Sequence, residues 1–294
     1  MMSCPDSVLF PLSGPFSLED TLNCGQCFHW KPEPGGRYSG VIGHTAVMVS
    51  VADGHLRCER LSLDDTPLEP LCRQYFDLDT DYGLFLELCQ CHPVLRQAAD
   101  FAGGIRVLCQ QPWEALCSFI LSQNNNIKRI TGLVSRLREQ FGDPIPCRDG
   151  ITRFSFPSAQ RLAVLTVEDL APVRSGFRAK YVIDAAQKTA SEAIRLESLF
   201  SVPTCDAIAK LMEIKGVGPK VAQCALLFGW HRLDCLPRDV WIIRVMDTLF
   251  PEGLPEPVRP YAGIAQQYLF HYVRAHPEIC ADRAKNPKLA ANAT

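Results

Sequence analysis

The spacing of apolar residues divides the chain into two unequal parts. In the first sixty or so residues apolar and polar positions alternate, and turn signals at 33–36 and 52–54 interrupt the alternation. This pattern is typical of short β-strands. The expected strands are 7–12, 27–30, 37–43, 46–51 and 55–60. From about residue 68 the apolar residues recur every three or four positions, which is the period of an α-helix.

The helical period continues to residue 276, and Gly, Pro, Asp and Asn between the segments act as stop signals. The expected helices are 70–76, 82–90, 93–101, 112–125, 127–142, 179–194, 205–214, 219–230, 240–250 and 261–276. The fold class is therefore α+β, with a small N-terminal antiparallel β-sheet domain followed by a large all-α core. We place the β domain with its first helices at 1–95, the helical core at 96–280 and a loosely held C-terminal tail at 281–294.

Composition places the chain among soluble globular proteins, with 47% hydrophobic and 21% charged residues. Apolar runs such as 224–230 are too short to cross a bilayer. The N-terminal residues lack the basic-then-apolar order of a signal peptide. We therefore expect an intracellular protein, cytoplasmic if bacterial, which we favour, and nuclear if eukaryotic.

The distribution of charge permits a nucleic-acid partner, although the net charge is −2. Residues 51–100 hold ten Asp or Glu against four Lys or Arg, a local charge of −6, so the rest of the chain sums to +4. Positive surface can then be concentrated away from that segment.

Fourteen cysteines are scattered along the chain, mostly in apolar stretches, so reduced buried thiols are expected. Cys24 and Cys27 have thioredoxin-like spacing, but no amphipathic helix follows them. Cys89 and Cys91 lack a second pair, or histidines, at zinc spacing. A redox or metal protein is therefore a disfavoured alternative, which metal analysis would test.

The stretch IKGVGPK, residues 214–220, predicts a tight turn between two helices. Gly216 and Gly218 allow the backbone dihedrals that a compact hairpin needs, and Pro219 fits the first turn of the second helix. The small side chains let backbone N–H groups approach a phosphate at the helix N-terminus. Residues 205–230 thus indicate a helix-hairpin-helix that contacts the DNA backbone without reading its sequence. A glycine-rich turn without a ligand is the alternative.

Lys220 lies at the start of that second helix, where a positive charge is unfavourable. Desolvation and a helix N-terminus both favour the uncharged form of an amine, and only the uncharged amine is a nucleophile. Asp239 follows a Leu-Pro pair and opens another helix. Its carboxylate could cap that helix, or it could stabilise the positive charge that develops as a glycosidic bond breaks.

The Lys220–Asp239 pair resembles the lysine-bearing branch of the HhH-GPD DNA glycosylases. Only Cys280 follows Cys235, so the C-terminal four-cysteine iron–sulfur pattern of the endonuclease III-like members is absent. The branch that the chain resembles is then the 8-oxoguanine DNA glycosylases. This resemblance extends over nearly the whole chain. It implies an N-terminal 8-oxoguanine glycosylase β domain and a helical HhH-GPD core.

The resemblance also implies a bifunctional glycosylase and AP lyase. Such an enzyme would flip 8-oxoguanine out of duplex DNA, use Lys220 to form a Schiff base and cleave the strand by β-elimination. It would require no cofactor and would act as a monomer on double-stranded DNA that contains 8-oxoguanine. A glycosylase of the same fold for another oxidised base, and a non-catalytic helix-hairpin-helix DNA-binding protein, are the alternatives.

Residues that face the DNA follow from the same resemblance. The carbonyl of Gly25 would accept a hydrogen bond from N7–H, which 8-oxoguanine has and guanine lacks. Asn124 would fill the space left by the flipped base. Arg129 and Arg178 would contact the orphaned cytosine, and Phe177, where the family commonly has Tyr, would wedge at the kinked base step.

The resemblance assigns the base pocket to Cys224, Gln266 and Phe270. Gln266 would read the Watson–Crick edge, and Cys224 and Phe270 would stack on opposite faces of the base. Periodicity alone would make Phe270 a core residue. One departure is Trp241, which occupies a position where animal members have a phosphate-contacting histidine.

The family's hairpin also binds a cation through main-chain carbonyls. Those carbonyls would belong here to Met212, Ile214 and Val217.

Overall fold

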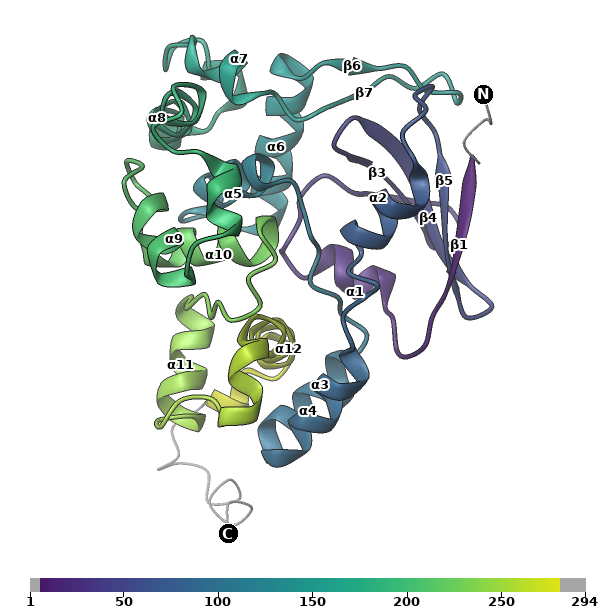
Figure 1. Ribbon diagram of the computed structural model, residues 1–294, viewed down its shortest axis with the longest axis vertical. Coiled ribbons are helices and arrows are strands. Elements are labelled where there is room, and N and C mark those ends of the chain that lie inside the picture. Colours follow the sequence, from purple (N-terminus) through teal and green to yellow (C-terminus); the bar gives the residue numbers. More distant parts are fainter. Residues whose placement is uncertain (1–5, 281–294) are drawn as a thin grey trace.

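The computed structural model describes residues 6–280 of the chain, and the tail predicted at 281–294 lies outside these described residues. The chain forms a β-sheet domain on one side of a larger helical body (Figure 1). Within residues 6–280, no helix combines the length and the apolar character that a membrane span needs.

The N-terminal sheet is antiparallel and five-stranded, in the order β1-β5-β4-β3-β2. Its strands are β1 (Ser7–Pro11), β2 (Lys31–Glu33), β3 (Arg37–Ile42), β4 (Thr45–Ala52) and β5 (His55–Arg60). Val49 pairs with Cys58, and both side chains are fully buried against α2 (Leu68–Tyr75) and its neighbours. The predicted fold class, a small antiparallel sheet domain followed by a helical core, is confirmed.

In this domain one helix was missed and one expected strand is wrong. Residues 18–23 form a helix, α1 (Leu18–Asn23), which begins at an N-cap where Ser17 Oγ accepts from the Asp20 amide. Residues 27–30 are not a strand. The Gln26 side chain is fully buried and bonds to main-chain groups of Arg106 and Leu108, so this segment bridges the two parts of the molecule and does not join the sheet.

The helical body follows the predicted pattern closely. Its helices are α3 (Tyr82–Leu88), α4 (Pro93–Ala102), α5 (Pro112–Ser122), α6 (Ile127–Phe141), α7 (Ala159–Ala163), α8 (Ala179–Ala190), α9 (Thr204–Leu211), α10 (Pro219–Gly229), α11 (Val240–Leu249) and α12 (Ala262–Ala275). It is not entirely helical, because β6 (Pro144–Ile145) and β7 (Arg153–Phe154) form a short antiparallel pair after α6.

Helices α5 and α10 form the centre of the helical body and pack against each other. Both are apolar around most of their circumference, which is typical of helices enclosed by others. The rings of Phe119 and Phe228 stack with centroids 5.2 Å apart. Gly229 permits the close approach, because a Cβ there would lie 3.0 Å from the Cβ of Ala115. This packing fixes the N-terminal end of α10, where Lys220 lies.

A buried polar cluster joins the β domain to the helical body. Glu114 on α5 pairs with Arg138 on α6, and His29 Nδ1 lies 3.2 Å from Glu114 Oε1. Burial alone would raise the pKa of the Glu114 carboxyl, but the charge of Arg138 and the contact with His29 outweigh burial and lower that pKa to about 2. Burial and the charge of Arg138 lower the pKa of His29, so the imidazole stays neutral near pH 7.

We predict that Glu114→Gln lowers the free energy of unfolding by about 3 kcal/mol near neutral pH, because it leaves Arg138 buried without its partner. The folded pKa of Glu114 lies below its ordinary value of 4.5, so its contribution is present above that value and is lost as the pH falls toward 2. Urea unfolding of both proteins across this acid range measures the difference. The variant should lose less stability on acidification, and an equal loss would contradict the assignment.

Asp149→Asn is the matched control, since it removes a carboxylate that pairs with Arg153 in a partly exposed site. Its cost should stay below about 1 kcal/mol.

Candidate active site

The hairpin between α9 and α10 forms where it was predicted, but only Gly216 needs a glycine backbone, because Gly218 has a φ of −97°. Gly216 has a φ of +76°, and a Cβ there would lie 2.5 Å from the ring of Tyr181. Gly218 is the N-cap of α10, and no atom lies within 4 Å of the place where its Cβ would be. The two glycines therefore differ in role: Gly216 is required by the protein's own packing, whereas Gly218 faces open space at a helix N-terminus, where an anion can bind.

Lys220 lies half-buried in the first turn of α10. Its Nζ is 5.8 Å from the centroid of the buried Phe119 ring. One helical turn further, Cys224 is 4% exposed. Burial raises the pKa of the Cys224 thiol, a hydrogen bond and the charge of Lys220 oppose the rise, and the charge of Asp239 adds to it. Lys220 and Asp239 thus both lie close enough to Cys224 for their charges to affect its thiol, and the catalytic roles of Lys220 and Asp239 stay predictions.

Asp239 is the N-cap of α11, and its Oδ1 accepts hydrogen bonds from the amides of Trp241 and Ile242 at 3.1 and 2.8 Å. The capping role considered from sequence is therefore real. Within residues 6–280, Oδ2 has no hydrogen-bond partner and no ion pair joins Asp239 to Lys220. One oxygen thus holds the carboxylate in place and the other remains available for chemistry.

The turn at Gly25 lies against helices α6 and α12. Gly25 has a φ of +90°, and a Cβ there would lie 3.1 Å from Cδ1 of Ile127 at the start of α6. Gln267 Nε2 on α12 donates to Cys24 Sγ at 3.4 Å, which brings the turn at Gly25 next to the predicted reader Gln266. Sequence reasoning missed Gln267 and Gln26, the two glutamines that position this turn. Gln26 lies within the Gly-Gln-Cys segment noted in the sequence, whereas no sequence signal pointed to Gln267.

Gln266 is 6% exposed, and its Oε1 is buried without a hydrogen-bond partner among the described residues. Buried acceptors are nearly always satisfied in folded proteins. Oε1 is therefore able to accept a hydrogen bond from a ligand that donates one. One turn further along α12, Phe270 is half-buried and packs at the edge of the core, which fits both the stacking role and the core role.

The residues predicted to face DNA differ in exposure. Asn124 is exposed with a φ of +47°, Arg129 is exposed, and Phe177 is 48% exposed. Arg178 is 3% exposed: its Nε donates to the Gln123 carbonyl at 2.7 Å, and its Nη2 donates to the Asn124 carbonyl at 3.1 Å. In this structure Arg178 holds the Asn124 loop, and its contact with cytosine stays a prediction.

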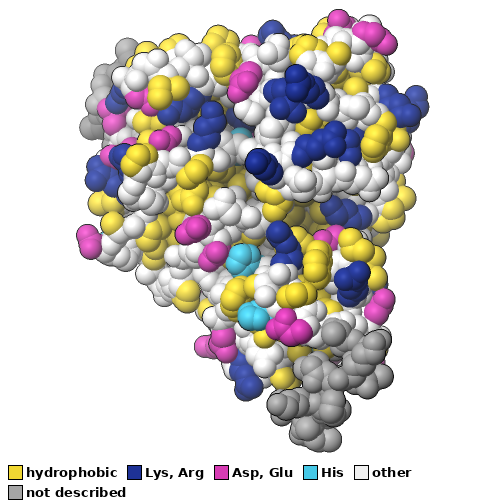
Figure 2. Space-filling model, turned by 180° about the vertical axis from the view of Figure 1, so that it is seen from behind, with side chains coloured by type: hydrophobic (Ala, Val, Ile, Leu, Met, Phe, Trp, Pro, Cys, Tyr) yellow, Lys and Arg dark blue, Asp and Glu magenta, His cyan; other side chains and the backbone are white. Residues whose placement is uncertain are grey.

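Basic side chains surround this region. Lys128, Lys180 and Lys215 are exposed, in addition to Arg129. Figure 2 shows Lys and Arg side chains gathered over the upper part of one face. This concentration fits the charge asymmetry found in the sequence and provides a surface suited to phosphates.

The structure shows where Trp241 and the carbonyls of the proposed cation loop lie, but their contacts with phosphate and with a cation stay predictions. Trp241 is half-buried, with the Arg244 guanidinium 5.6 Å from its ring centroid. In the proposed cation loop of Met212, Ile214 and Val217, the Ile214 carbonyl accepts the Val217 amide at 3.0 Å.

The Cys24–Cys27 pair does not form a redox site here. Both thiols are free and buried, and burial raises the pKa of Cys24 to about 12. Such a thiol is poorly suited to attack a disulfide. Across residues 6–280, no group of three His, Cys, Asp or Glu side chains is arranged to hold a metal ion. The Cys24–Cys27 pair therefore gives the redox alternative no support, and the expectation that no cofactor is required stays a prediction.

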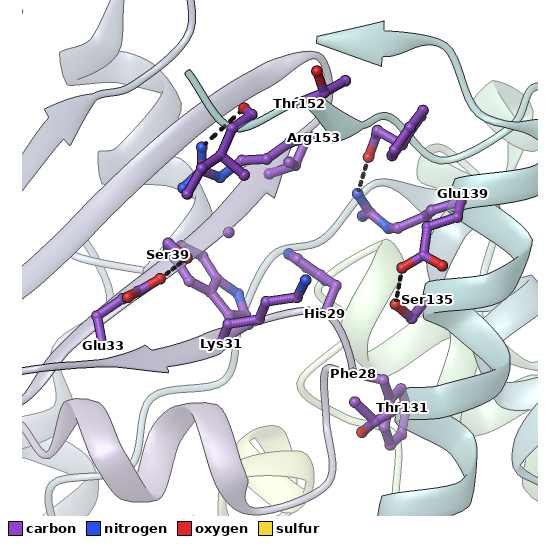
Figure 3. A pocket seen from close by; sticks show the side chains of 16 residues that line it. Phe28, His29, Lys31, Glu33, Ser39, Thr131, Ser135, Glu139, Thr152 and Arg153 are labelled. Carbon is purple, nitrogen blue, oxygen red and sulfur yellow. Dashed lines mark hydrogen bonds between the residues drawn. The ribbon is translucent and has the colours of Figure 1, made fainter. Parts of the chain in front are cut away.

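A separate cavity of about 320 Å³ lies between strands β2 and β3, α6 and β7 (Figure 3). Its walls include Phe28, His29, Lys31, Ser135 and Arg153, and none of the predicted site residues lines it. It is thus distinct from the site around Lys220.

Comparisons with known proteins place both halves of the chain. Residues 8–116 match the 8-oxoguanine DNA glycosylase N-terminal domain, and residues 117–255 match the HhH-GPD superfamily base excision DNA repair proteins. The chain is 32% identical over 283 residues to the N-glycosylase/DNA lyase OGG1 of Arabidopsis thaliana, covering 86% of this chain and 76% of that protein.

Two solved structures share the fold. MBOgg1 in complex with a low-affinity DNA ligand gives a TM-score of 0.85 with 38% identity, covering 93% of this chain and 97% of that one. The Clostridium acetobutylicum 8-oxoguanine glycosylase/lyase, bound to double-stranded DNA with cytosine opposite 8-oxoguanine, gives 0.84 with 31% identity, covering 92% and 96%.

Fold and matches together define a base-excision DNA glycosylase. The chain matches most of the length of the Arabidopsis enzyme and of both solved structures, so the family can be stated more specifically. The chain belongs to the 8-oxoguanine DNA glycosylase family, which comprises N-glycosylase/DNA lyases.

The contrast between the hairpin glycines gives a matched pair of variants. Gly218→Ala should cost less than about 1 kcal/mol of stability, because its methyl group enters open space. It should nevertheless weaken binding to duplex DNA about tenfold, or about 1.4 kcal/mol, because the methyl group occupies the phosphate site. Gly216→Ala should cost more than about 2 kcal/mol of stability through backbone strain and the clash with Tyr181.

Thermal unfolding and fluorescence anisotropy with a labelled duplex separate these effects. Unchanged DNA affinity in Gly218→Ala would show that the phosphate lies elsewhere.

Proposed function

We propose that the chain removes 8-oxoguanine opposite cytosine from duplex DNA and then cleaves the strand by β-elimination, with Lys220 as the nucleophile. The observation that carries this proposal is the meeting of Lys220, Cys224 and Asp239 at the N-terminal ends of α10 and α11. The proposed reaction involves only groups of the protein and the DNA, without a cofactor, and one chain acts on one lesion.

In the proposed reaction the Lys220 amine attacks C1′ of the damaged nucleotide. The C1′–N9 bond breaks, its electron pair leaves with the base, and the base takes up a proton. The attached nitrogen then loses one proton, the C1′–O4′ bond breaks and O4′ takes up a proton, which leaves a protonated Schiff base between Lys220 and the opened sugar. A proton is then lost from C2′, and the 3′-phosphate leaves with the electron pair of the C3′–O3′ bond, which cleaves the strand.

The surroundings of Lys220 suit this role. The buried Cys224 thiol and the face of the Phe119 ring lie beside the amine, and no carboxylate in residues 6–280 forms an ion pair with it. The free Oδ2 of Asp239 can stabilise the positive charge that develops on the sugar as the base departs. Because Oδ1 is held by two amides, the carboxylate needs little reorganisation during the reaction.

Recognition of the base would use both ends of the pocket. The Gly25 carbonyl accepts a hydrogen bond from N7–H, and the unpartnered Oε1 of Gln266 accepts one from the Watson–Crick edge. Unmodified guanine has a lone pair at N7, so it would face the Gly25 carbonyl with a second acceptor. Phe270 and Cys224 would enclose the two faces of the base.

The hairpin at 216–218 would bind the DNA backbone, while Asn124, Arg129 and Phe177 act inside the duplex. Phe177 enters between bases and Asn124 takes the vacated space, which offsets an unstacking cost of a few kcal/mol. Arg129 contacts the cytosine directly. Arg178 joins it, or holds the Asn124 loop as it does in the free protein.

The Schiff-base mechanism is tested by trapping with borohydride on a duplex that contains 8-oxoguanine opposite cytosine. The wild type should yield a covalent protein–DNA adduct and Lys220→Gln should yield none, because only the amine can form a reducible imine. Denaturing gel electrophoresis measures the adduct. Absence of an adduct with the wild type would reject the mechanism, and an adduct with Lys220→Gln would place the nucleophile elsewhere.

Two controls sharpen the result. Lys31→Gln removes an exposed lysine on β2, outside the site around Lys220, and should trap normally. A thymine-glycol duplex tests the rival substrate class: efficient trapping there, without trapping on 8-oxoguanine, would favour a glycosylase of the same fold for another oxidised base.

The role of Phe177 in base flipping gives a further prediction. Phe177→Ala should change the free energy of unfolding by less than about 1 kcal/mol, because the ring is half-exposed. It should slow excision from duplex DNA about tenfold or more, since the kinked base step loses its wedge. Single-turnover excision and 2-aminopurine fluorescence, which reports flipping, measure the effect.

Phe200→Ala is the matched control, because Phe200 is 53% exposed and packs beside Trp230, at the opposite end of α10 from Lys220. Excision by this control should match the wild type. An unchanged rate in Phe177→Ala would remove the wedge assignment.

A further inference from the structure

The segment that leads into the hairpin is held from behind by helix α8. Asp184 Oδ2 accepts the main-chain amide of Lys215 at 2.8 Å. Lys188, one turn further along α8, donates to the Glu213 carbonyl and, at 2.9 Å, to Asp184 Oδ2. A buried acid and its lysine partner thus bind the chain at two points, immediately before Gly216.

Asp184 is ionised in this position. Its side chain is 11% exposed, and burial alone would raise the pKa of the carboxyl. The hydrogen bonds from Lys188 and from the Lys215 amide, with the charges of both lysines, outweigh burial and lower that pKa. The Lys215 ammonium lies 3.5 Å from Oδ1 and is 76% exposed. Two ammonium groups therefore neutralise the acid, so it does not repel a phosphate at the hairpin.

Tyr181, one turn before Asp184 on the same helix face, contacts the turn itself. The Tyr181 ring occupies the space where a side chain at Gly216 would lie. It also meets Phe177 edge-to-face, with ring centroids 6.0 Å apart. Positions i, i+3 and i+7 of a helix share one face, so Tyr181, Asp184 and Lys188 form a continuous support between the wedge residue and the hairpin.

We propose that Asp184 is a positioning residue for DNA binding. With Tyr181 and Lys188 it fixes the hairpin relative to Phe177, so that the hairpin amides and the wedge engage one duplex in a single register. The inference rests on the proposed function for the identity of the hairpin's ligand. It adds a residue that touches no DNA and that acts through the Lys215 amide.

The geometry distinguishes this role from a general contribution to stability. Lys220 lies on α10, which packs separately on α5. Loosening the 213–216 segment should therefore affect capture of the backbone far more than the chemical step once DNA is bound. A change at Asp184 should therefore alter DNA affinity and KM but leave the single-turnover rate nearly unchanged.

The test compares Asp184→Ala and Asp184→Asn with the wild type, at a temperature where circular dichroism shows all three folded. Asp184→Ala should weaken binding to an undamaged duplex about tenfold and raise KM on an 8-oxoguanine duplex to a similar extent. Its single-turnover rate at saturating DNA should stay within about threefold of the wild type. Asp184→Asn keeps an oxygen that can accept the Lys215 amide, so it should recover most of the affinity.

Asp81→Ala is the matched control, because Asp81 also accepts a main-chain amide, that of Leu84 at 3.0 Å, but does so at the start of α3. It should bind DNA like the wild type. Wild-type affinity in Asp184→Ala together with a lowered Tm would overturn the proposal and leave Asp184 a purely structural residue. Loss of binding without excision of 8-oxoguanine by the wild type would instead support the positioning role while rejecting the proposed function.

Discussion

The packing of α5 against α10 is the contact on which the rest of the structure depends. Both helices are enclosed by apolar neighbours, and the stacked rings of Phe119 and Phe228 fix their separation. Phe119 faces the Lys220 amine, and the start of α6, which follows α5 directly, meets the turn at Gly25. The central core of the protein would therefore also form the floor of the proposed active site, and Lys220 lies on a helix that is enclosed by others.

Around this centre, buried polar side chains hold three segments of the proposed site in place. Gln26 holds the recognition turn to the 106–108 segment, Arg178 holds the Asn124 loop, and Asp184 holds the hairpin entry. Each of these residues is buried, and its side chain bonds to main-chain groups. Main-chain groups near the DNA are thus fixed by side chains farther inside. This arrangement leaves the surface side chains, such as Arg129 and Phe177, available for contact.

The sequence predicted much of this arrangement because its strongest signals are local. The glycine–proline pattern at 216–219 and the change of hydrophobic period report on neighbouring residues, and both predictions hold. The helix at 18–23 was missed although Ser17 and Asp20 have capping-box spacing. The buried state of Arg178 and the bond from Lys215 to Asp184 could not be predicted, since each joins residues more than thirty positions apart.

The unsatisfied oxygen of Gln266 has a consequence for how selectivity is maintained. No described side chain or main-chain group donates to this oxygen, and a buried acceptor that stays without a donor costs about 1–3 kcal/mol. A base that donates a hydrogen bond to Gln266 Oε1 removes this cost. A base that presents a lone pair there leaves the cost in place, and the two acceptors repel each other. In the proposed pocket, this difference would contribute to the energy that separates the right base from the wrong one. Rejection of an unsuitable base would require no conformational change.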